Sequence, residues 1–492
     1  MNAPLLSYRQ ARQSGLCLVQ EQGREQLYCA PEVDPVMLHE LQRHRPLPAV
    51  CQWLDQAQFE QRLAAVYEAR SGSAEALLDG LADQVDLQSL MGDLPSSGDL
   101  LDSEHEAPVI RLINGLFAEA IRLGASDLHI ETFEESVRVR FRVDGHLREV
   151  LRPPRALSAM LVSCVKVMAQ MDIAEKRTPQ DGRIRLKAGG REIDIRVSTL
   201  PGIHGERVVM RVLDKQAARL SLEHLGMPDS VASALARALA QPNGIILSTG
   251  PTGSGKTTTL YSCLNELNDG QRNILTVEDP VEYAISGIGQ TPLNPRAGMT
   301  FASGLRAILR QDPDVIMIGE IRDRETAEIA VQASLTGHLV LSTLHTNSAV
   351  GAITRLLDMG LEPFLLASTL KGVMAQRLVR RLCSSCRSWR GMTSAEARLL
   401  PGLDSLSQLP QEGGCEHCNG SGFRGRVGLY EFISVDVALS EQIHAGASEA
   451  TLERYLEAKR ESLAQAAVSR LAAGDTTLGE VLRAVQGSAG DA

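Results

Sequence analysis

The sequence predicts an α/β protein of several domains, in which a parallel sheet with a glycine-rich loop forms the largest part. After residue 213, apolar strand, loop and helix patterns recur at the spacing that parallel sheets require. Upstream of residue 213, short segments alternate apolar and basic positions, as strands with one exposed face do. The chain has 492 residues, which is enough for about three domains.

The composition is that of a folded protein and gives no general preference for nucleic acid. Charged residues make up 22% and hydrophobic residues 43% of the chain. Sixty acidic and fifty basic side chains give a net charge of −10, which disfavours broad electrostatic binding to nucleic acid. The apolar runs are far shorter than the ~20 residues of a membrane span, and residues 1–4 do not begin an export signal. We therefore expect no transmembrane segment and a cytoplasmic location.

Three regions precede the parallel sheet. Residues 1–70 mix short apolar patterns with prolines, which predicts a small α/β module. Residues 71–106 contain no Lys or Arg and carry an excess of acids around residues 95–98, which predicts a linker. Residues 107–213 begin with a helical pattern that stops at Gly124 and continue with alternating strands, so an α+β domain is expected there.

A phosphate-binding loop follows the apolar run at 245–247 and precedes a helical start, as its mechanism requires. The loop consists of Gly250, Pro251, Thr252, Gly253, Ser254, Gly255, Lys256 and Thr257, and Thr258 comes next. Its backbone N–H groups can surround phosphate oxygens at the start of the helix. Lys256 supplies a charge to the β- and γ-phosphates of ATP, and the Thr257 hydroxyl can bind Mg²⁺.

Two later segments supply the carboxylates that phosphoryl transfer needs. The strand pattern at 274–277 ends in Glu278 and Asp279, with Glu282 close behind, and ligands bind at such strand ends. The buried strand pattern at 315–318 ends in Gly319-Glu320, with glycine where many phosphate-loop enzymes place an acid that binds the metal. We therefore expect Glu320 to reach Mg²⁺ through water and another carboxylate to assist.

Two histidines, His338 and His345, flank a third apolar strand pattern. A histidine beside a core is usually structural. If both histidines lie near the phosphates, they can sense the γ-phosphate, and the sequence favours this second interpretation.

Two C-x-x-C pairs lie close together, Cys383 with Cys386 and Cys415 with Cys418. Four thiolates suit a closed tetrahedral Zn²⁺ site that holds a small loop-rich segment together. A redox dithiol is the alternative for a single pair. We expect zinc within residues 383–427, with His417 outside the ligand set, and a helical region over residues 428–492.

The phosphate loop, the acidic segment at 278–282, the Gly319-Glu320 segment and the histidine segment follow one another along the chain. In this order they resemble the four nucleotide-site motifs of the secretion ATPase superfamily, which drives type II secretion and type IV pilus machines. Residues 124–131 and 140–145 resemble that family's preceding domain, so the similarity covers roughly residues 107–435. The resemblance implies a PAS-like domain, a RecA-like core over residues 214–382 and a ring of six chains. It also implies that Glu282 is the general base and that Glu320 organises the metal.

The same resemblance assigns roles to arginines. It implies that Arg196 and Arg211 reach the nucleotide's phosphates when the domains close. The family's other arginine positions match Arg306, Arg310, Arg322 and Arg355.

The four-cysteine insertion and the short N-terminal region with its acidic linker resemble the type II secretion branch. That branch implies a motor for pseudopilus assembly and protein export, peripheral to the inner membrane. The implied contact is between residues 1–70 and the cytoplasmic domain of a membrane partner. The alternatives are a type IV pilus assembly ATPase, a nucleic-acid translocase and a nucleotide-binding scaffold without turnover.

Overall fold

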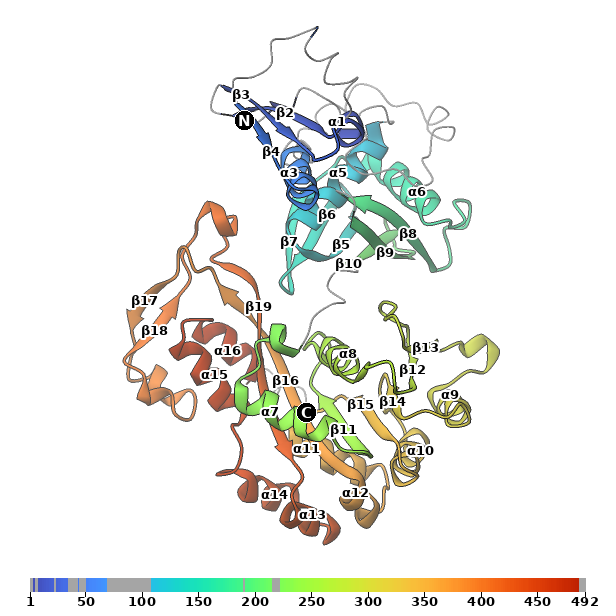
Figure 1. Ribbon diagram of the computed structural model, residues 1–492, viewed down its shortest axis with the longest axis vertical. Helices are drawn as coiled ribbons and strands as arrows, with labels where there is room; N and C mark the ends of the chain where they lie inside the picture. Colours follow the sequence, from blue (N-terminus) through green and yellow to red (C-terminus); the bar gives the residue numbers. More distant parts are fainter. Residues whose placement is uncertain are drawn as a thin grey trace. The chain divides into compact units, whose positions relative to one another are not determined.

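The computed structural model describes residues 3–4, 8–21, 24–33, 43, 50–68, 108–188, 191–214 and 222–485. The chain divides into two compact units, Met1–Lys215 and Gln216–Ala492 (Figure 1). The linker expected over 71–106 and the chain end after 485 lie outside the described residues.

The first unit begins with the small α/β module that the sequence predicts. Its elements are β1 (Ala3–Pro4), α1 (Tyr8–Ser14), β2 (Leu16–Glu21), β3 (Arg24–Cys29), β4 (Val50–Trp53) and α3 (Gln56–Glu68). The strands form one sheet in the order β1-β2-β3-β4. Ala11 of α1 and Phe59 and Leu63 of α3 bury one face of this sheet, so the module has a core of its own.

The rest of the first unit is an antiparallel sheet with helices on one face. Its elements are α5 (Pro108–Arg122), β5 (Ala125–Thr132), β6 (Val137–Val143), β7 (His146–Leu151), α6 (Ser158–Met168), β8 (Gln180–Ala188), β9 (Arg191–Leu200) and β10 (Arg207–Asp214). The strand order is β7-β6-β5-β10-β9-β8. Leu128 and Phe141 face the helix-covered core with Leu112 of α5. As the alternating sequence predicts, the opposite face is polar.

The second unit is built on a seven-stranded sheet in the order β13-β12-β14-β15-β11-β16-β19. Its strands are β11 (Gly244–Thr249), β12 (Ile274–Glu278), β13 (Gly289–Pro292), β14 (Val315–Ile318), β15 (Leu339–Leu344), β16 (Leu370–Leu382) and β19 (Phe423–Ser434). All neighbours pair in parallel except β16 and β19. The predicted parallel α/β sheet is therefore present, with an antiparallel edge strand.

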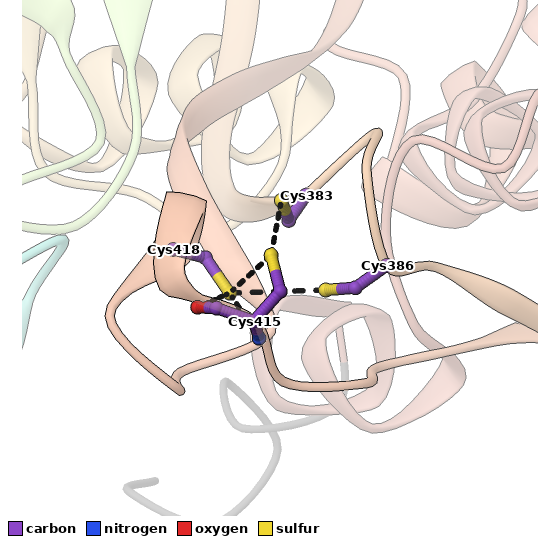
Figure 2. Close-up of side chains that lie close together, drawn as sticks. All are labelled: Cys383, Cys386, Cys415 and Cys418. Atoms are coloured by element: carbon purple, nitrogen blue, oxygen red, sulfur yellow. Dashed lines mark hydrogen bonds between the residues drawn. The ribbon is translucent and has the colours of Figure 1, made fainter. Parts of the chain in front are cut away.

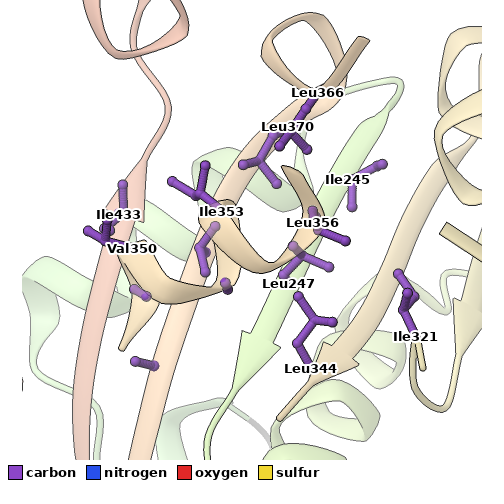
Figure 3. Packing of buried hydrophobic residues seen from close by; sticks show 14 of the residues in the cluster. Ile245, Leu247, Ile321, Leu344, Val350, Ile353, Leu356, Leu366, Leu370 and Ile433 are labelled. Carbon is purple, nitrogen blue, oxygen red and sulfur yellow. The ribbon is translucent and has the colours of Figure 1, made fainter. Parts of the chain in front are cut away.

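Helices cover both faces of this sheet. They are α7 (Asp229–Leu239), α8 (Lys256–Leu267), α9 (Phe301–Ile308), α10 (Arg324–Leu335), α11 (Ala349–Asp358) and α12 (Pro363–Thr369). Ile246 of β11 packs on the α7 and α8 side. Ile245 and Leu247 pack on the opposite side with Ile353 of α11 (Figure 3). Because neighbouring residues of one strand face opposite layers, the buried strands are apolar at nearly every position.

The expectation of a helical region from residue 428 is wrong at its start, since β19 runs to Ser434. Leu429 and Ile433 are buried in the core of the sheet, so this segment completes the sheet before the helices begin. The helices that follow are α13 (Val437–His444), α14 (Glu449–Leu456), α15 (Leu463–Ala472) and α16 (Leu478–Val485). Arg380 of β16 donates to Glu480 of α16 at 2.8 Å, which anchors the last helix.

The loop between β16 and β19 contains a two-stranded sheet, β17 (Ser388–Gly391) with β18 (Gln408–Gln411). Across the described ranges, no helix has the length and apolar character to span a membrane.

Candidate functional site

The predicted phosphate loop joins the carboxyl end of β11 to the start of α8. The parallel strands β15 and β16 flank β11, and β14 lies beyond β15. The segments that follow β12, β14 and β15 therefore emerge at the same edge of the sheet as the loop. In doubly wound sheets this edge is where ligands bind.

The loop backbone requires glycine at its first position. Gly250 has φ of 149°, and a Cβ atom there would lie 2.5 Å from the Gln376 carbonyl oxygen. Pro251, Thr252 and Gly253 are exposed, whereas Ser254 is buried and its hydroxyl has no partner among the described residues. The Ser254 hydroxyl therefore remains available for a phosphate oxygen.

Lys256 is 8% exposed, and its Nζ donates to the carbonyl oxygens of Gly250 at 2.6 Å and Pro251 at 3.1 Å. Burial, opposed by the nearby Glu320 and aided by Arg377, lowers the pKa of Lys256 to about 8. The ammonium is thus held inside the loop by main-chain oxygens, which phosphate oxygens can replace. Thr257 is exposed and Thr258 half-buried at the start of α8, where their side chains are close to the loop.

Glu320 lies at the carboxyl end of β14 between two basic side chains. Its carboxylate accepts from Arg322, and its Oε2 lies 3.5 Å from Nε2 of His345. Desolvation lowers the pKa of His345, and the nearby Lys256 lowers it further. The structure therefore brings Lys256, Glu320, Arg322 and His345 to one place, as phosphate binding requires.

The structure does not bring His338 to this edge together with His345. It precedes β15, and its carbonyl oxygen accepts from Gly244 at the start of β11. The length of a six-residue strand, about 20 Å, separates that edge from the phosphate loop. Its Nδ1 lies 2.8 Å from the Ala333 carbonyl oxygen, which indicates a structural role.

Glu278, the last residue of β12, is buried, and its carboxylate is engaged by side chains of the second unit. Its carboxylate accepts from the Tyr261 hydroxyl, from Thr276 Oγ1 at 2.5 Å and from Gln290 Nε2 at 3.1 Å. These donors leave the carboxylate little capacity for a metal ion. Glu278 and Thr276 share a strand face because side chains two residues apart do so.

The other two acids of this segment are more accessible. Asp279 is exposed and interacts electrostatically with Arg322. Glu282 is half-buried, and its backbone N–H donates to the Tyr261 hydroxyl at 3.2 Å. Glu282 thus follows the strand at the nucleotide edge, as its expected role requires.

The arginines implied by the family resemblance lie in both units. Arg196 of β9 and Arg211 of β10 are register partners on neighbouring strands of the first unit, and Arg211 Nε lies 3.0 Å from Asp127 Oδ1. In the second unit, Arg306 pairs with Glu325 at 2.6 Å. Arg310 donates to the Arg306 carbonyl oxygen, and Arg355 is exposed on α11.

Sequence reasoning missed two polar residues of β16 behind the phosphate loop. Gln376 Oε1 accepts from Thr259 Oγ1 of α8 at 2.8 Å. Arg377 is 4% exposed and donates to the carbonyl oxygens of Asn347 at 2.8 Å and Ala484 at 3.2 Å. A polar pair inside an apolar strand was the signal that could have found them.

The four cysteines form a compact cluster at the base of the loop between β16 and β19 (Figure 2). Their Sγ atoms lie within 4.8 Å of one another. Neighbouring Sγ atoms are 3.7 to 3.9 Å apart, close to the edge of about 3.8 Å that Zn–S bonds of about 2.3 Å give in a tetrahedron. The N–H groups of Cys415 and Gly422 hold the pKa of the Cys418 thiol below its usual value. The donor set therefore fits zinc, and His417 instead contacts Arg424.

Together, the sheet, the loop and the acids at its carboxyl edge define a P-loop nucleotide-binding protein with a four-cysteine insertion. Residues 102–483 match the family described as Type II/IV secretion system protein, and residues 5–67 match a domain family described for GSPII protein E. The chain belongs to the type II secretion system protein E family of secretion ATPases.

Relatives match over nearly the whole chain. A type II secretion system protein E of Aeromonas hydrophila is 52% identical over 482 residues, which are 98% of this chain and 96% of the relative. Its counterpart in Pseudomonas aeruginosa is 54% identical over 480 residues, covering 97% and 95%. The type II secretion system ATPase E of Vibrio cholerae is 57% identical over 440 residues, covering 88% and 87%.

Two solved structures show the same fold. The Legionella pneumophila ATPase DotB gives a TM-score of 0.58 at 22% identity, over 80% of this chain and 97% of that chain. The pilus retraction motor PilT with bound ADP gives 0.53 at 25% identity, over 75% and 95%. The predicted fold class is therefore confirmed.

Proposed function

We propose that this chain hydrolyses ATP as the hexameric motor of a type II secretion system and powers pseudopilus assembly and protein export. The convergence of Lys256, Glu320, Arg322 and His345 at the carboxyl edge of the sheet carries the catalytic part of this proposal. Relatives named type II secretion system protein E, which match nearly the full chain, support the secretion part. The match of residues 5–67 to a domain of GSPII protein E favours secretion over pilus assembly.

In this proposal the phosphate loop binds the triphosphate and the acids order the attacking water. Bound Mg²⁺ would be held by Thr257 and, through water, by Glu320, and it would neutralise charge on the phosphates. Lys256 exchanges its two carbonyl partners for phosphate oxygens. Glu282 takes the proton of the water as general base. Asp279 is exposed beside this segment and is proposed to assist at the metal.

Arg196 and Arg211 are proposed to add positive charge when the first unit closes onto the nucleotide. Charge developing on the transferred phosphoryl group makes such a contribution large in a site that excludes water. Within the first unit, Asp127 Oδ1 lies 3.0 Å from Arg211 Nε and partly neutralises its charge. Closure then couples nucleotide state to rigid-body motion in a ring.

The N-terminal module, residues 1–70, is proposed to bind the cytoplasmic domain of an inner-membrane partner. The chain would then be cytoplasmic and peripheral to the inner membrane. Deleting residues 1–70 tests the recruitment, and membrane localisation and export that survive the deletion would refute it.

The four cysteines are proposed to hold one Zn²⁺ that keeps the insertion folded.

Hydrolysis by three variants tests the catalytic proposal. Lys256→Ala should abolish turnover, because the phosphates lose a cation in a site from which water is largely excluded. Glu282→Gln and Glu320→Gln should bind ATP with near wild-type affinity and hydrolyse it at only a small residual rate. A non-hydrolysing scaffold predicts the same low rate in all four proteins, so a measurable wild-type rate separates the two functions. Wild-type hydrolysis by Glu282→Gln would remove this residue from the base role.

A further inference from the structure

A buried cluster of hydrogen bonds joins the helix of the phosphate loop to the acidic segment after β12. Tyr261 lies at its centre, on α8, and is completely buried. Lys256 precedes Tyr261 by five residues on the same helix, about one and a half turns. The cluster therefore connects the residue that holds the phosphates to the segment that contains Glu282.

The direction of each hydrogen bond in the cluster follows from the partners. The Glu278 carboxylate accepts from Thr276 Oγ1 and Gln290 Nε2, so the Tyr261 hydroxyl is its third donor. The same hydroxyl oxygen accepts from the backbone N–H of Glu282 at 3.2 Å. One hydroxyl group thus fixes both the carboxylate of Glu278 and the main chain of Glu282.

We propose that Tyr261 is a positioning residue that holds Glu282 at the distance from the phosphate loop that water activation requires. This inference rests on the proposed function, in which Glu282 is the general base. Tyr261 does not touch the reacting atoms; it acts through the backbone of Glu282. Burial raises the pKa of Tyr261 well above its ordinary value, and the neighbouring Glu278 raises it further, which keeps the hydroxyl a neutral donor at all working pH values.

A fixed base matters because proton transfer depends steeply on geometry. A displacement of about 1 Å at a reacting group can lower the rate of the chemical step by about 100-fold. Glu282 lies in a segment without helix or strand structure, so its backbone lacks the regular hydrogen bonds of those elements. The hydrogen bond to the Tyr261 hydroxyl connects this segment to α8. A shift of the phosphate loop on nucleotide binding would then be transmitted to the base.

Packing alone is the competing explanation for a buried tyrosine. The Tyr261 ring belongs to the core between α8 and the sheet and packs edge-on against Tyr283, with centroids 4.6 Å apart and an interplanar angle of 86°. Tyr261→Phe keeps this ring and removes only the hydroxyl. Tyr283→Phe is the matched control, because it removes a hydroxyl from the partner ring and leaves the bonds to Glu278 and Glu282 in place.

The experiment measures ATP hydrolysis and ATP affinity for the full-length wild type, Tyr261→Phe and Tyr283→Phe, with melting temperatures to show that each is folded. We expect Tyr261→Phe to lower kcat by about 10- to 100-fold with an ATP dissociation constant within about twofold of wild type. Tyr283→Phe should match wild type in both. Equal losses of affinity and kcat in Tyr261→Phe would indicate general damage to the fold and overturn the inference.

A double variant tests whether Tyr261 acts through Glu282. In single-turnover measurements, Tyr261→Phe combined with Glu282→Gln should be no slower than Glu282→Gln alone, because the base is already absent. Multiplying effects would place the role of Tyr261 elsewhere. A wild-type kcat for Tyr261→Phe overturns the inference while the proposed function stands. No hydrolysis by the wild type overturns both.

Discussion

Replacing Lys256 by methionine should make the nucleotide-free second unit more stable, although the same change removes the main phosphate-binding charge. The Lys256 ammonium is 8% exposed and has no carboxylate within ion-pair distance among the described residues. Lowering its pKa from 10.5 to about 8 corresponds to a cost of about 3 kcal/mol at pH 7. The substitution also removes two hydrogen bonds to carbonyl oxygens, worth about 1 kcal/mol each. The expected net gain is therefore about 1 kcal/mol.

The pH dependence gives the sign of this effect independently. Because the folded-state pKa of Lys256 lies below the unfolded value, the cost is present in full below about pH 8 and disappears as the pH rises toward 10.5. The advantage of Lys256→Met over wild type should thus fall by about 2 kcal/mol between pH 7 and pH 10. Lys371→Met is the control, since the Lys371 ammonium bonds Ser368 at an exposed site.

Denaturant unfolding followed by Trp389 fluorescence measures this difference. The chain has two tryptophans, so a Trp53→Phe background leaves one reporter, which lies in β17 of the second unit. ADP should stabilise the wild type and stabilise the variant much less. A variant that is less stable than wild type at pH 7, or a stability difference that does not change up to pH 10, would show that burial of the Lys256 ammonium has no such cost.

Three further changes have expected outcomes. Cys383→Ser should remove the bound zinc, as elemental analysis would show, and expose residues 383–427 to proteolysis while ATP still binds; zinc at one per chain in this variant would contradict the ligand set. Burial alone would raise the pKa of Glu480, but Arg380 outweighs burial and holds this pKa at about 2. Glu480→Gln should therefore destabilise the second unit by about 3 kcal/mol. The stabilisation from Glu480 should persist above about pH 4.5 and be lost as the pH falls toward 2. As a control, Glu328→Gln, which removes an exposed ion pair with Arg324, should cost under about 0.5 kcal/mol. Arg211→Ala should depress hydrolysis without changing zinc content, and a wild-type rate in the assembled ring would exclude its role at the phosphates.

The sequence predicts the sheet well because its strands carry local signals. The apolar runs at 245–247 and 315–318 and the loop between strand and helix identify β11, β14 and the start of α8. The strand β19 was missed because an antiparallel return after a long insertion depends on pairing with β16, which no local pattern specifies.

The site was predicted less completely, for two different reasons. The position of His338 could have been inferred, because the residue before a parallel strand lies at the edge opposite the phosphate loop. The burial of Glu278 depends on Tyr261, which lies 17 residues earlier on another element, so sequence spacing gave no indication of it. The cysteine cluster was found because its ligand spacing is local within each pair.

Recruitment, closure and assembly remain proposals that rest on the family. If, as proposed, arginines of the first unit add charge at the phosphates when the units close in a ring, assembled chains should hydrolyse ATP faster than isolated ones.

Steady-state ATP hydrolysis per chain, compared between the isolated monomer and a hexamer enforced by fusion to a six-fold scaffold, tests whether the chain works as an assembled motor. The rate per chain should be at least about tenfold higher in the hexamer, and Lys256→Ala should abolish that increase. Equal rates per chain in the two states, or no hydrolysis in the enforced hexamer, would contradict the proposed assembled motor.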